Sequence, residues 1–259
     1  MLLVIDVGNS NTVVGVWDGD NLVEHWRVET QASRTADEYR LVLHDLMSLS
    51  SVKPDAIDTG IVASVVPPLT PVFCDAVERS FGFVPLVVGP GLKTGMRIHY
   101  DNPREVGADR IANAVAAFEE VGGAVVVVDF GTATTFDAIA VDGSYLGGAI
   151  APGVGIAADA LARRTAKLPR VELARPSRVI GKNPIGSIQS GTFFGYVGLV
   201  DGMVTRVRAE MTEHGEVQCL ATGGLAGLFA TESRQIDAVD PWLTLKGLRI
   251  LHARNVSGG

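Results

Sequence analysis

The sequence predicts an α/β protein built from two similar halves, each a mixed β-sheet flanked by helices. First, one pattern of apolar strand, polar glycine turn, second strand and Asp-Gly turn occurs twice, over residues 2–19 and 125–143. Second, other strand-length apolar runs alternate with segments whose apolar residues recur at helical spacing. Third, glycine supplies 30 of 259 residues, roughly 12% against a usual ~7%. This excess indicates tight turns, or loops whose backbone approaches a ligand.

The two copies of the pattern align at a constant offset. Three positions recur 123 residues later: Asp6 as Asp129, Gly8 as Gly131, and Thr12 as Thr135. We interpret this as an internal duplication. We therefore expect an N-terminal half at 1–121, with a phosphate loop and a substrate or catalytic segment. A C-terminal half at 122–259 would hold the second phosphate or cation loop and an adenosine-binding turn.

The remaining elements follow from apolar periodicity and turn residues. Beyond the hairpins, we expect strands at 21–28, 61–66, 84–88 and 217–221, and helices at 36–50, 71–81, 108–121, 188–211 and 242–253. Glycines at mostly three- and four-residue spacing put one small-residue face on the long helix; they are Gly191, Gly195, Gly198 and Gly202. That face predicts close packing against another helix or a subunit. We expect residues 257–259 to form a frayed end.

Composition excludes several classes of protein. The formal net charge of −7 and the isoelectric point near 5.2 argue against a dedicated nucleic-acid binder or a binder of anionic membranes. No apolar run approaches the roughly 18 residues of a transmembrane helix, and the N-terminus lacks the basic start of a signal peptide. Cys74 and Cys219 lie far apart and form no CxxC motif. This cysteine usage is typical of a reducing, cytoplasmic location.

The repeated Asp-x-Gly turns carry the clearest chemistry. A carboxylate at a strand end, such as Asp6, can hold a hydrated Mg²⁺, because Mg²⁺ keeps water and takes one or two carboxylates with phosphate oxygens. Gly8 lets the turn approach phosphate, and the polar residues 9–12 offer donors. An ordinary hairpin turn explains one such copy equally well. Two copies favour a nucleotide clamp.

Two other glycine-containing segments are candidates for phosphate-binding or nucleotide-binding turns. Gly89–Thr94 fails the GxxxxGK[ST] spacing, so we reject it as a Walker A motif. Thr222, Gly223 and Gly224 follow an apolar strand and can open a helix, which suits contact with adenosine or phosphate.

Asp109 and Arg110 stand in the first turn of an otherwise apolar predicted helix. In one interpretation Asp109 only complements the positive end of the helix dipole. In the other, Asp109 is a carboxylate base and Arg110 a cationic anchor for an anionic substrate. The residues alone leave both interpretations open. Asp137 has no distinctive sequence context.

Several blocks in the same order resemble type III pantothenate kinase, within the superfamily of actin, Hsp70 and sugar kinases. The blocks are Asp6–Thr12, Tyr100–Pro103, Gly107–Arg110, Asp129–Thr135 and Gly147–Gly153. The resemblance implies two RNase H-like halves with a nucleotide cleft between them. It implies ATP-dependent phosphorylation of pantothenate to 4′-phosphopantothenate, the first step of coenzyme A biosynthesis. It also implies a cytoplasmic homodimer that uses Mg²⁺ and either K⁺ or NH₄⁺.

The resemblance also implies roles for individual residues. The ATP-binding residues would be Asp6, Val7, Gly8, Asn9, Ser10, Asn11, Thr12, Val13 and Thr132, beside the turn at Gly223 and Gly224. The pantothenate-binding residues would be Tyr100, Gly107, Ala108, Asp109, Arg110 and Pro184. Asp109 would accept the proton, Asp129 would bind the monovalent cation, and Asp6 would hold Mg²⁺ through water.

One position departs from the family pattern. The family carries Gly-x-Asn-Thr with a substrate-contacting threonine, whereas this chain has Pro184 at that position, after Asn183. Proline has neither hydroxyl nor N–H, and it pushes Asn183 towards extended backbone. We therefore expect a substrate contact that is lost or replaced. Two alternatives stay open: a related kinase for another hydroxy acid, and a nucleotide-binding regulatory or accessory protein.

Overall fold

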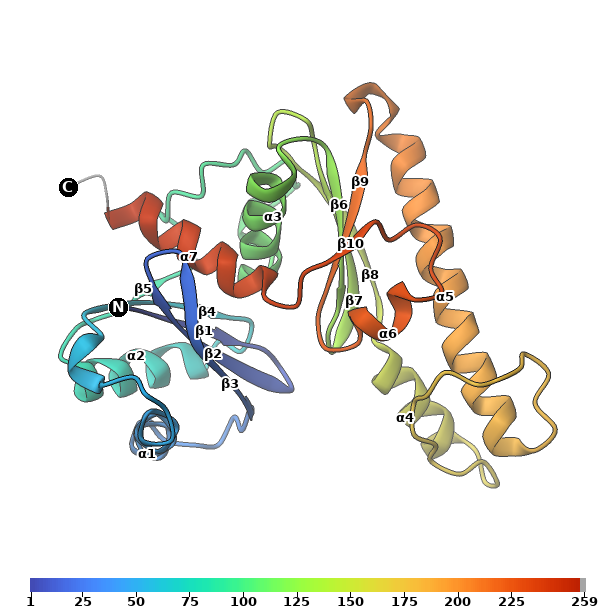
Figure 1. Ribbon diagram of the computed structural model, residues 1–259, viewed down its shortest axis with the longest axis horizontal. Helices are drawn as coiled ribbons and strands as arrows, with labels where there is room; N and C mark the ends of the chain where they lie inside the picture. The colour runs from blue at the N-terminus through green and yellow to red at the C-terminus, as the bar shows by residue number, and fades with distance from the viewer. Residues whose placement is uncertain (257–259) are drawn as a thin grey trace. The chain divides into compact units, whose positions relative to one another are not determined.

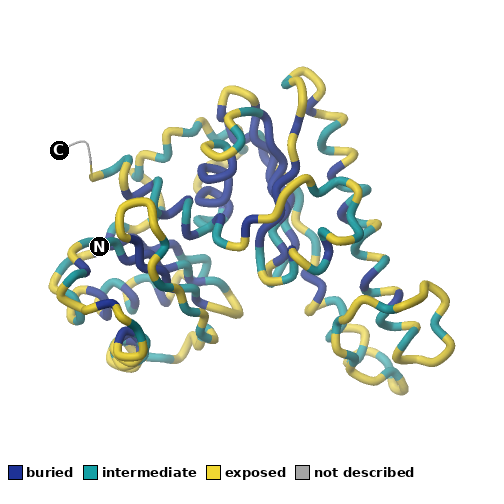
Figure 2. The backbone as a smooth tube through the Cα atoms, in the orientation of Figure 1, coloured by how far each residue is buried: buried dark blue, intermediate teal, exposed yellow. Residues whose placement is uncertain are grey.

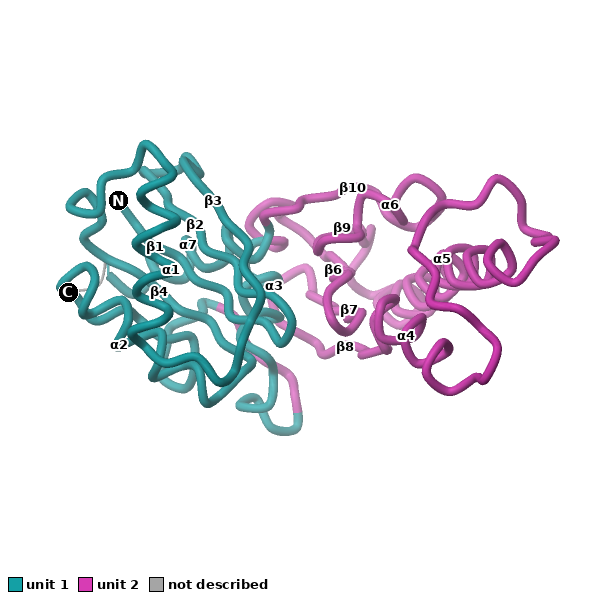
Figure 3. Tube along the Cα trace, turned by 90° about the horizontal axis from the view of Figure 1, so that it is seen from below, with its two compact units in different colours: residues 1–95, 101–116, 243–259 teal, residues 96–100, 117–242 magenta. Residues whose placement is uncertain are grey.

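The computed structural model describes residues 1–256, and the expectation for residues 257–259 lies outside the described residues (Figure 1). The chain divides into two compact units, each described by itself below (Figure 3). Unit 1 comprises 1–95, 101–116 and the segment from 243 onward, and unit 2 comprises 96–100 and 117–242. These units differ from the predicted halves 1–121 and 122–259 chiefly in grouping the C-terminal helix with unit 1.

Unit 1 contains a mixed sheet with the strand order β3-β2-β1-β4-β5. Its strands are β1 (Leu2–Val7), β2 (Asn11–Asp18), β3 (Asn21–Glu29), β4 (Thr59–Ser64) and β5 (Leu86–Val87). The first three strands are antiparallel neighbours, while β4 runs parallel to β1 and β5 parallel to β4. The expected strands are present, although the one predicted over 84–88 is only two residues long.

Helices α1 (Ala36–Ser48), α2 (Leu69–Phe81) and α7 (Leu243–Val256) belong to unit 1 with this sheet, as does most of α3 (Ala108–Val121, whose last turn belongs to unit 2). Thr35 and Glu38 form a capping box that starts α1. Gly247 permits a close crossing of α7 over α3, because a Cβ there would lie 1.9 Å from the Ala112 carbonyl oxygen. Helix α7 also packs on β1 and β4, which explains why it groups with unit 1.

Unit 2 repeats the sheet, with the order β8-β7-β6-β9-β10. Its strands are β6 (Val125–Phe130), β7 (Ala133–Ile139), β8 (Tyr145–Pro152), β9 (Gln218–Thr222) and β10 (Ala238–Val239). The antiparallel and parallel pairings match those of unit 1 strand for strand. Strand β8 and the helix after it, α4 (Val154–Arg164), were not among the expected elements.

The long helix α5 (Pro184–Glu210) packs on this sheet beside the short α6 (Ala226–Ala230) (Figure 1). Stacked rings of Phe130, Phe193 and Phe229 form the centre of the packing. The glycine face of α5 is open: no side chain or backbone outside the helix lies within 4 Å of the Cβ positions at Gly191, Gly195, Gly198 and Gly202. Within residues 1–256 no other helix approaches these four glycines closely, and packing of the face against a subunit stays a prediction.

Burial follows the central strands of each sheet, as Figure 2 shows for β1 and β6. The two hairpins differ by one residue in their turns, because Val7 pairs with Thr12 whereas Phe130 pairs with Thr134. Thr134, rather than the Thr135 of the constant offset, therefore occupies the position of Thr12. Both of these threonines are fully buried.

Candidate functional site

The first Asp-x-Gly turn lies where the parallel strands β1 and β4 end. Asp6 stands in register with Val13 and Ala63. The Gly8 N–H donates to the Asn11 carbonyl at 3.0 Å, and a Cβ at Gly8 would lie only 2.8 Å from that oxygen. Glycine is therefore required for the turn to close. The polar side chains at 9–11 are exposed, so they are available to a ligand.

The start of α3 reaches the same end of this sheet through Val65. The Val65 N–H donates to the carbonyl of Val7 at 3.0 Å, and its side chain lies 3.6 Å from the Cβ position of Gly107. That Cβ position is also 2.5 Å from Oδ1 of Asp109. Any side chain at 107 would displace the carboxylate. Sequence reasoning missed Val65, since nothing in an apolar residue after a strand indicates this bridging role.

The carboxyl group of Asp109 is largely shielded from water, and its pKa is shifted as a result. Burial raises the pKa of its carboxyl group, while the backbone N–H of Arg110 and the nearby guanidinium of Arg110 oppose that shift. The N–H of Arg110 donates to Oδ1 at 2.8 Å, and the Arg110 side chain is itself buried. A raised pKa brings a carboxylate closer to the pH at which it accepts protons efficiently. Ala108 completes this turn between Gly107 and Asp109.

The second Asp-x-Gly turn gathers the corresponding residues of unit 2. Asp129 pairs in register with Thr135 and Thr222. A Cβ at Gly223, whose φ is +90°, would lie 2.5 Å from Oδ1 of Asp129, so the glycine turn closes directly over the carboxylate. The structure thus brings Asp129 and the predicted adenosine turn together. Gly224, next along, is exposed.

Thr132 lies beside the start of α4. A Cβ at Gly153, the N-cap of that helix, would meet the Thr132 carbonyl oxygen at 2.1 Å. Thr132, Gly153 and Gly223 therefore lie at one end of the second sheet, with Asp129. In the sequence Gly153 is recognisable only as the end of the Gly147–Gly153 block, because the close approach that demands glycine there arises from the chain fold.

Two predicted substrate residues belong to unit 2, whereas Gly107–Arg110 belongs to unit 1. Tyr100 is partly buried against Tyr145. Pro184 is exposed at the first helical position of α5, where proline is favoured. The Asn183 backbone is extended (φ −154°, ψ 164°), as predicted, and its side chain caps the helix by accepting from the Gly186 N–H at 2.8 Å.

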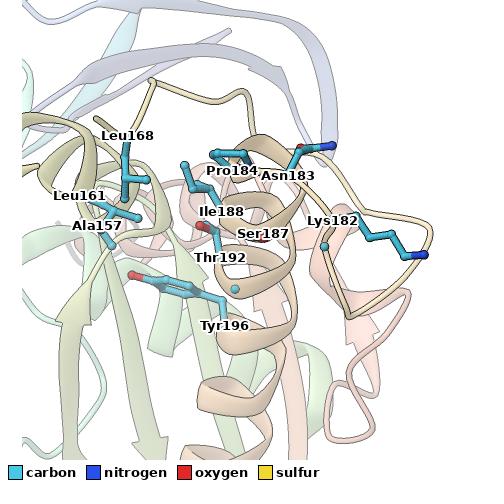
Figure 4. A pocket seen from close by; sticks show the side chains of 12 residues that line it. Ala157, Leu161, Leu168, Lys182, Asn183, Pro184, Ser187, Ile188, Thr192 and Tyr196 are labelled. Atoms are coloured by element: carbon cyan, nitrogen blue, oxygen red, sulfur yellow. The ribbon is translucent and has the colours of Figure 1, made fainter. Parts of the chain in front are cut away.

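Pro184 lines a pocket of about 830 Å³ in unit 2 (Figure 4). Helices α4 and α5 and the segment between them form its walls, which are largely apolar. Its lining includes Leu161, Leu168, Ile188 and Tyr196.

Among the helices of residues 1–256, none has both the length and the apolar character that crossing a bilayer requires.

Comparison with solved structures supports the two-lobe architecture. A Baf family protein from Campylobacter jejuni aligns with a TM-score of 0.62 and 19% identity, over 98% of this chain and 99% of that chain. An inorganic polyphosphate/ATP-glucomannokinase from an Arthrobacter strain aligns with a TM-score of 0.51 and 14% identity, over 100% and 99%. At these identities the similarity concerns the fold alone, which is the duplicated α/β fold of sugar kinases.

Sequence comparison is more specific. The sequence profile of the type III pantothenate kinase family matches residues 2–206. Type III pantothenate kinase of Geotalea daltonii is 56% identical over 255 residues, covering 98% of this chain and 99% of the relative. The same enzyme of Moorella thermoacetica is also 56% identical, over 98% and 100%. This chain therefore belongs to the type III pantothenate kinase family.

Proposed function

We propose that this chain transfers the γ-phosphoryl group of ATP to the primary hydroxyl of pantothenate, giving 4′-phosphopantothenate and ADP in the first step of coenzyme A biosynthesis. The observation that best supports this proposal is the position of the Asp109 carboxylate. Burial raises the pKa of this group. It stands at the same end of the sheet as the Asp6 turn. Ligands of open α/β sheets bind at the carboxyl ends of strands, where both features lie.

In this reaction the hydroxyl oxygen attacks the γ-phosphorus, its proton passes to Asp109, and the bond to the β,γ-bridging oxygen breaks. Kinases gain most of their rate from positioning and from neutralising charge, with an aspartate as proton acceptor. Arg110 would anchor the pantothenate carboxylate electrostatically, and Tyr100 would contact the substrate. The donors at 9–11 and Thr132 would bind the ATP phosphates.

We also propose that Asp129 binds K⁺ or NH₄⁺ and that Asp6 holds Mg²⁺ through water. A carboxylate cradled under glycine turns fits such ions, since the Gly223 Cβ position lies 2.5 Å and the Gly131 Cβ position 3.6 Å from Asp129 Oδ1. Hard cations prefer oxygen ligands of this kind. When bound, they would offset the negative charge of the phosphates.

The protein is further proposed to be a cytoplasmic homodimer. The open glycine face of α5 offers a close approach to a second copy, and several apolar side chains between β8 and the first turn of α5 are exposed. They are Ile150, Ile156, Leu161, Val179, Ile180 and Ile185. Light scattering after gel filtration should give twice the 27.3 kDa chain mass. Both cysteines, Cys74 and Cys219, are free thiols, as suits the cytoplasm.

An ADP-release assay over a panel of small hydroxy acids tests the reaction. Pantothenate should give the highest kcat/KM of the panel, and Asp109→Asn should abolish most of that turnover. A different preferred acid would instead favour the related-kinase alternative. ATP binding without turnover of any acid would favour the accessory-protein alternative.

A further inference from the structure

A buried carboxylate on β7 has no role in the proposed reaction. Asp137 is fully buried, and it accepts hydrogen bonds from the Tyr145 hydroxyl at 2.6 Å and from the Thr135 hydroxyl at 3.2 Å. A buried charge is costly unless such donors compensate it. These two donors explain how the buried carboxylate is tolerated. One of them, Tyr145, also contacts Tyr100, a predicted substrate-binding residue.

Tyr145 is held from two directions. Its side chain is anchored to Asp137, while its backbone pairs with the segment just before Tyr100. The Tyr145 N–H donates to the Arg97 carbonyl and the His99 N–H donates to the Tyr145 carbonyl, both at 2.8 Å. Tyr145 therefore ties this segment to the sheet of unit 2 immediately before Tyr100.

The ring of Tyr100 packs against the ring of Tyr145. Its centroid lies 6.4 Å from that of Tyr145, with the two planes tilted by 54°. Two residues after Tyr145 on strand β8, Gly147 has φ +123°, and a Cβ there would lie 3.8 Å from the Tyr100 ring. Aromatic pairs at this separation and tilt are attractive. All of these residues belong to unit 2.

We propose that Asp137 and Tyr145 are positioning residues that set the orientation of the Tyr100 ring for pantothenate. This rests on the proposed function for the role of Tyr100. A hydrogen bond that fixes Tyr145 also fixes the surface on which Tyr100 packs. Loss of the bond should therefore weaken use of pantothenate while leaving the ATP site unaffected.

Tyr145→Phe is the sharpest variant, since it keeps the ring and removes only the hydroxyl. Substituting Asp137 also disturbs Thr135, which lies opposite Asp129. Tyr39→Phe is the matched control in unit 1. Tyr39 is 1% exposed, and its hydroxyl accepts from the Gln31 N–H at 3.2 Å and donates to the Gln31 carbonyl at 3.1 Å.

For Tyr145→Phe we expect KM for pantothenate to rise about 2- to 12-fold, the factor that corresponds to one hydrogen bond. We expect kcat and the KM for ATP to stay within about twofold. Tyr39→Phe should lower the melting temperature to a similar degree and leave all three kinetic constants unchanged. If Tyr145→Phe does not fold, the isosteric Asp137→Asn carries the test. It replaces the charge-assisted bond with a weaker neutral one, so KM should rise by a smaller factor.

A second readout needs no substrate. The chain has four tyrosines, so ring-¹³C-tyrosine NMR gives few signals, assignable from Tyr→Phe variants. The Tyr100 signals should shift in Tyr145→Phe and stay in place in Tyr39→Phe. Unmoved Tyr100 signals, or an unchanged pantothenate KM in an active enzyme, would overturn the proposal. A wild type that does not phosphorylate pantothenate refutes the proposed function instead, while the Tyr100 signals still decide whether the ring is positioned in this way.

Discussion

Replacing Asp109 with asparagine should separate its two interpretations. The variant keeps the shape of the side chain and the oxygen that accepts the Arg110 N–H at 2.8 Å, so the first turn of α3 should stay intact. It removes only the proton acceptor. We expect kcat to fall about 10²- to 10⁴-fold, the usual worth of one acid–base group. That fall raises the activation barrier by about 3 to 5 kcal/mol.

The same variant should be more stable than the wild type at neutral pH. The folded-state pKa of Asp109 is raised by burial, so its charged form is disfavoured in the native protein. The wild type therefore loses stability as pH rises through that pKa, whereas asparagine stays neutral. The melting temperature of Asp109→Asn should exceed that of the wild type above this pKa. The difference should shrink as pH falls from this pKa towards the ordinary aspartate value of 3.8, and it should be gone below that value.

Two assays read these outcomes: steady-state kinetics with pantothenate varied at saturating ATP, and thermal melts over a pH series. The acid limb of the wild-type kcat profile should lie above the ordinary aspartate pKa, as the raised pKa of Asp109 requires. Asp37→Asn is the matched control, because Asp37 also lies in the first turn of a helix but is exposed and ion-paired. Near wild-type turnover in Asp109→Asn would assign Asp109 to helix-dipole electrostatics and refute its role as base.

Three further predictions concern unit 2. Gly223→Ala should raise the KM for ATP more than about tenfold and lower the melting temperature, because φ is +90° and the new methyl would lie 2.5 Å from Asp129 Oδ1; Gly227→Ala, with open space around its Cβ, is the control. Asp129→Asn should abolish activation by K⁺ or NH₄⁺ in titrations against Na⁺, and equal wild-type activity in Na⁺ and K⁺ buffers would contradict the cation role. Pro184→Thr should raise kcat/KM for pantothenate about 2- to 12-fold, from one restored hydrogen bond of about 0.5–1.5 kcal/mol; unchanged kinetics would mean that this position does not reach the substrate.

Local patterns were enough to predict both hairpins and helix α3. The strands of each hairpin are adjacent in sequence, and their apolar runs end at an Asp-x-Gly turn, so the signal is local. Asp109 could be placed at a helix start for the same reason. Its contact with the Gly107 Cβ position follows from that turn alone.

Elements that depend on tertiary pairing were not predictable in the same way. Strand β8 contains Gly147 and Gly148 and lacks regular apolar alternation, so it is defined by pairing with β7. Helix α4 begins after Gly153 without a side-chain cap, so no start signal precedes it.

Burial of polar residues was equally hidden. Nothing near Asp137 in sequence distinguishes a buried carboxylate from a solvated one, and its donor Tyr145 stands on the strand that pattern reasoning missed. The one-residue difference between the hairpin turns was hidden too, because a constant offset aligns Thr12 with Thr135 although the strand register aligns it with Thr134.

The central claim is that this chain phosphorylates pantothenate with Asp109 as the proton acceptor. The most direct test is ³¹P NMR of a reaction containing ATP, Mg²⁺, K⁺ and pantothenate, run with the wild type and with Asp109→Asn. We expect a phosphomonoester signal of 4′-phosphopantothenate that grows in step with ADP in the wild type and forms at least about 10²-fold more slowly with the variant. The absence of a phosphomonoester in the wild-type reaction would refute pantothenate phosphorylation, and its equal formation in both reactions would refute the role of Asp109 as proton acceptor.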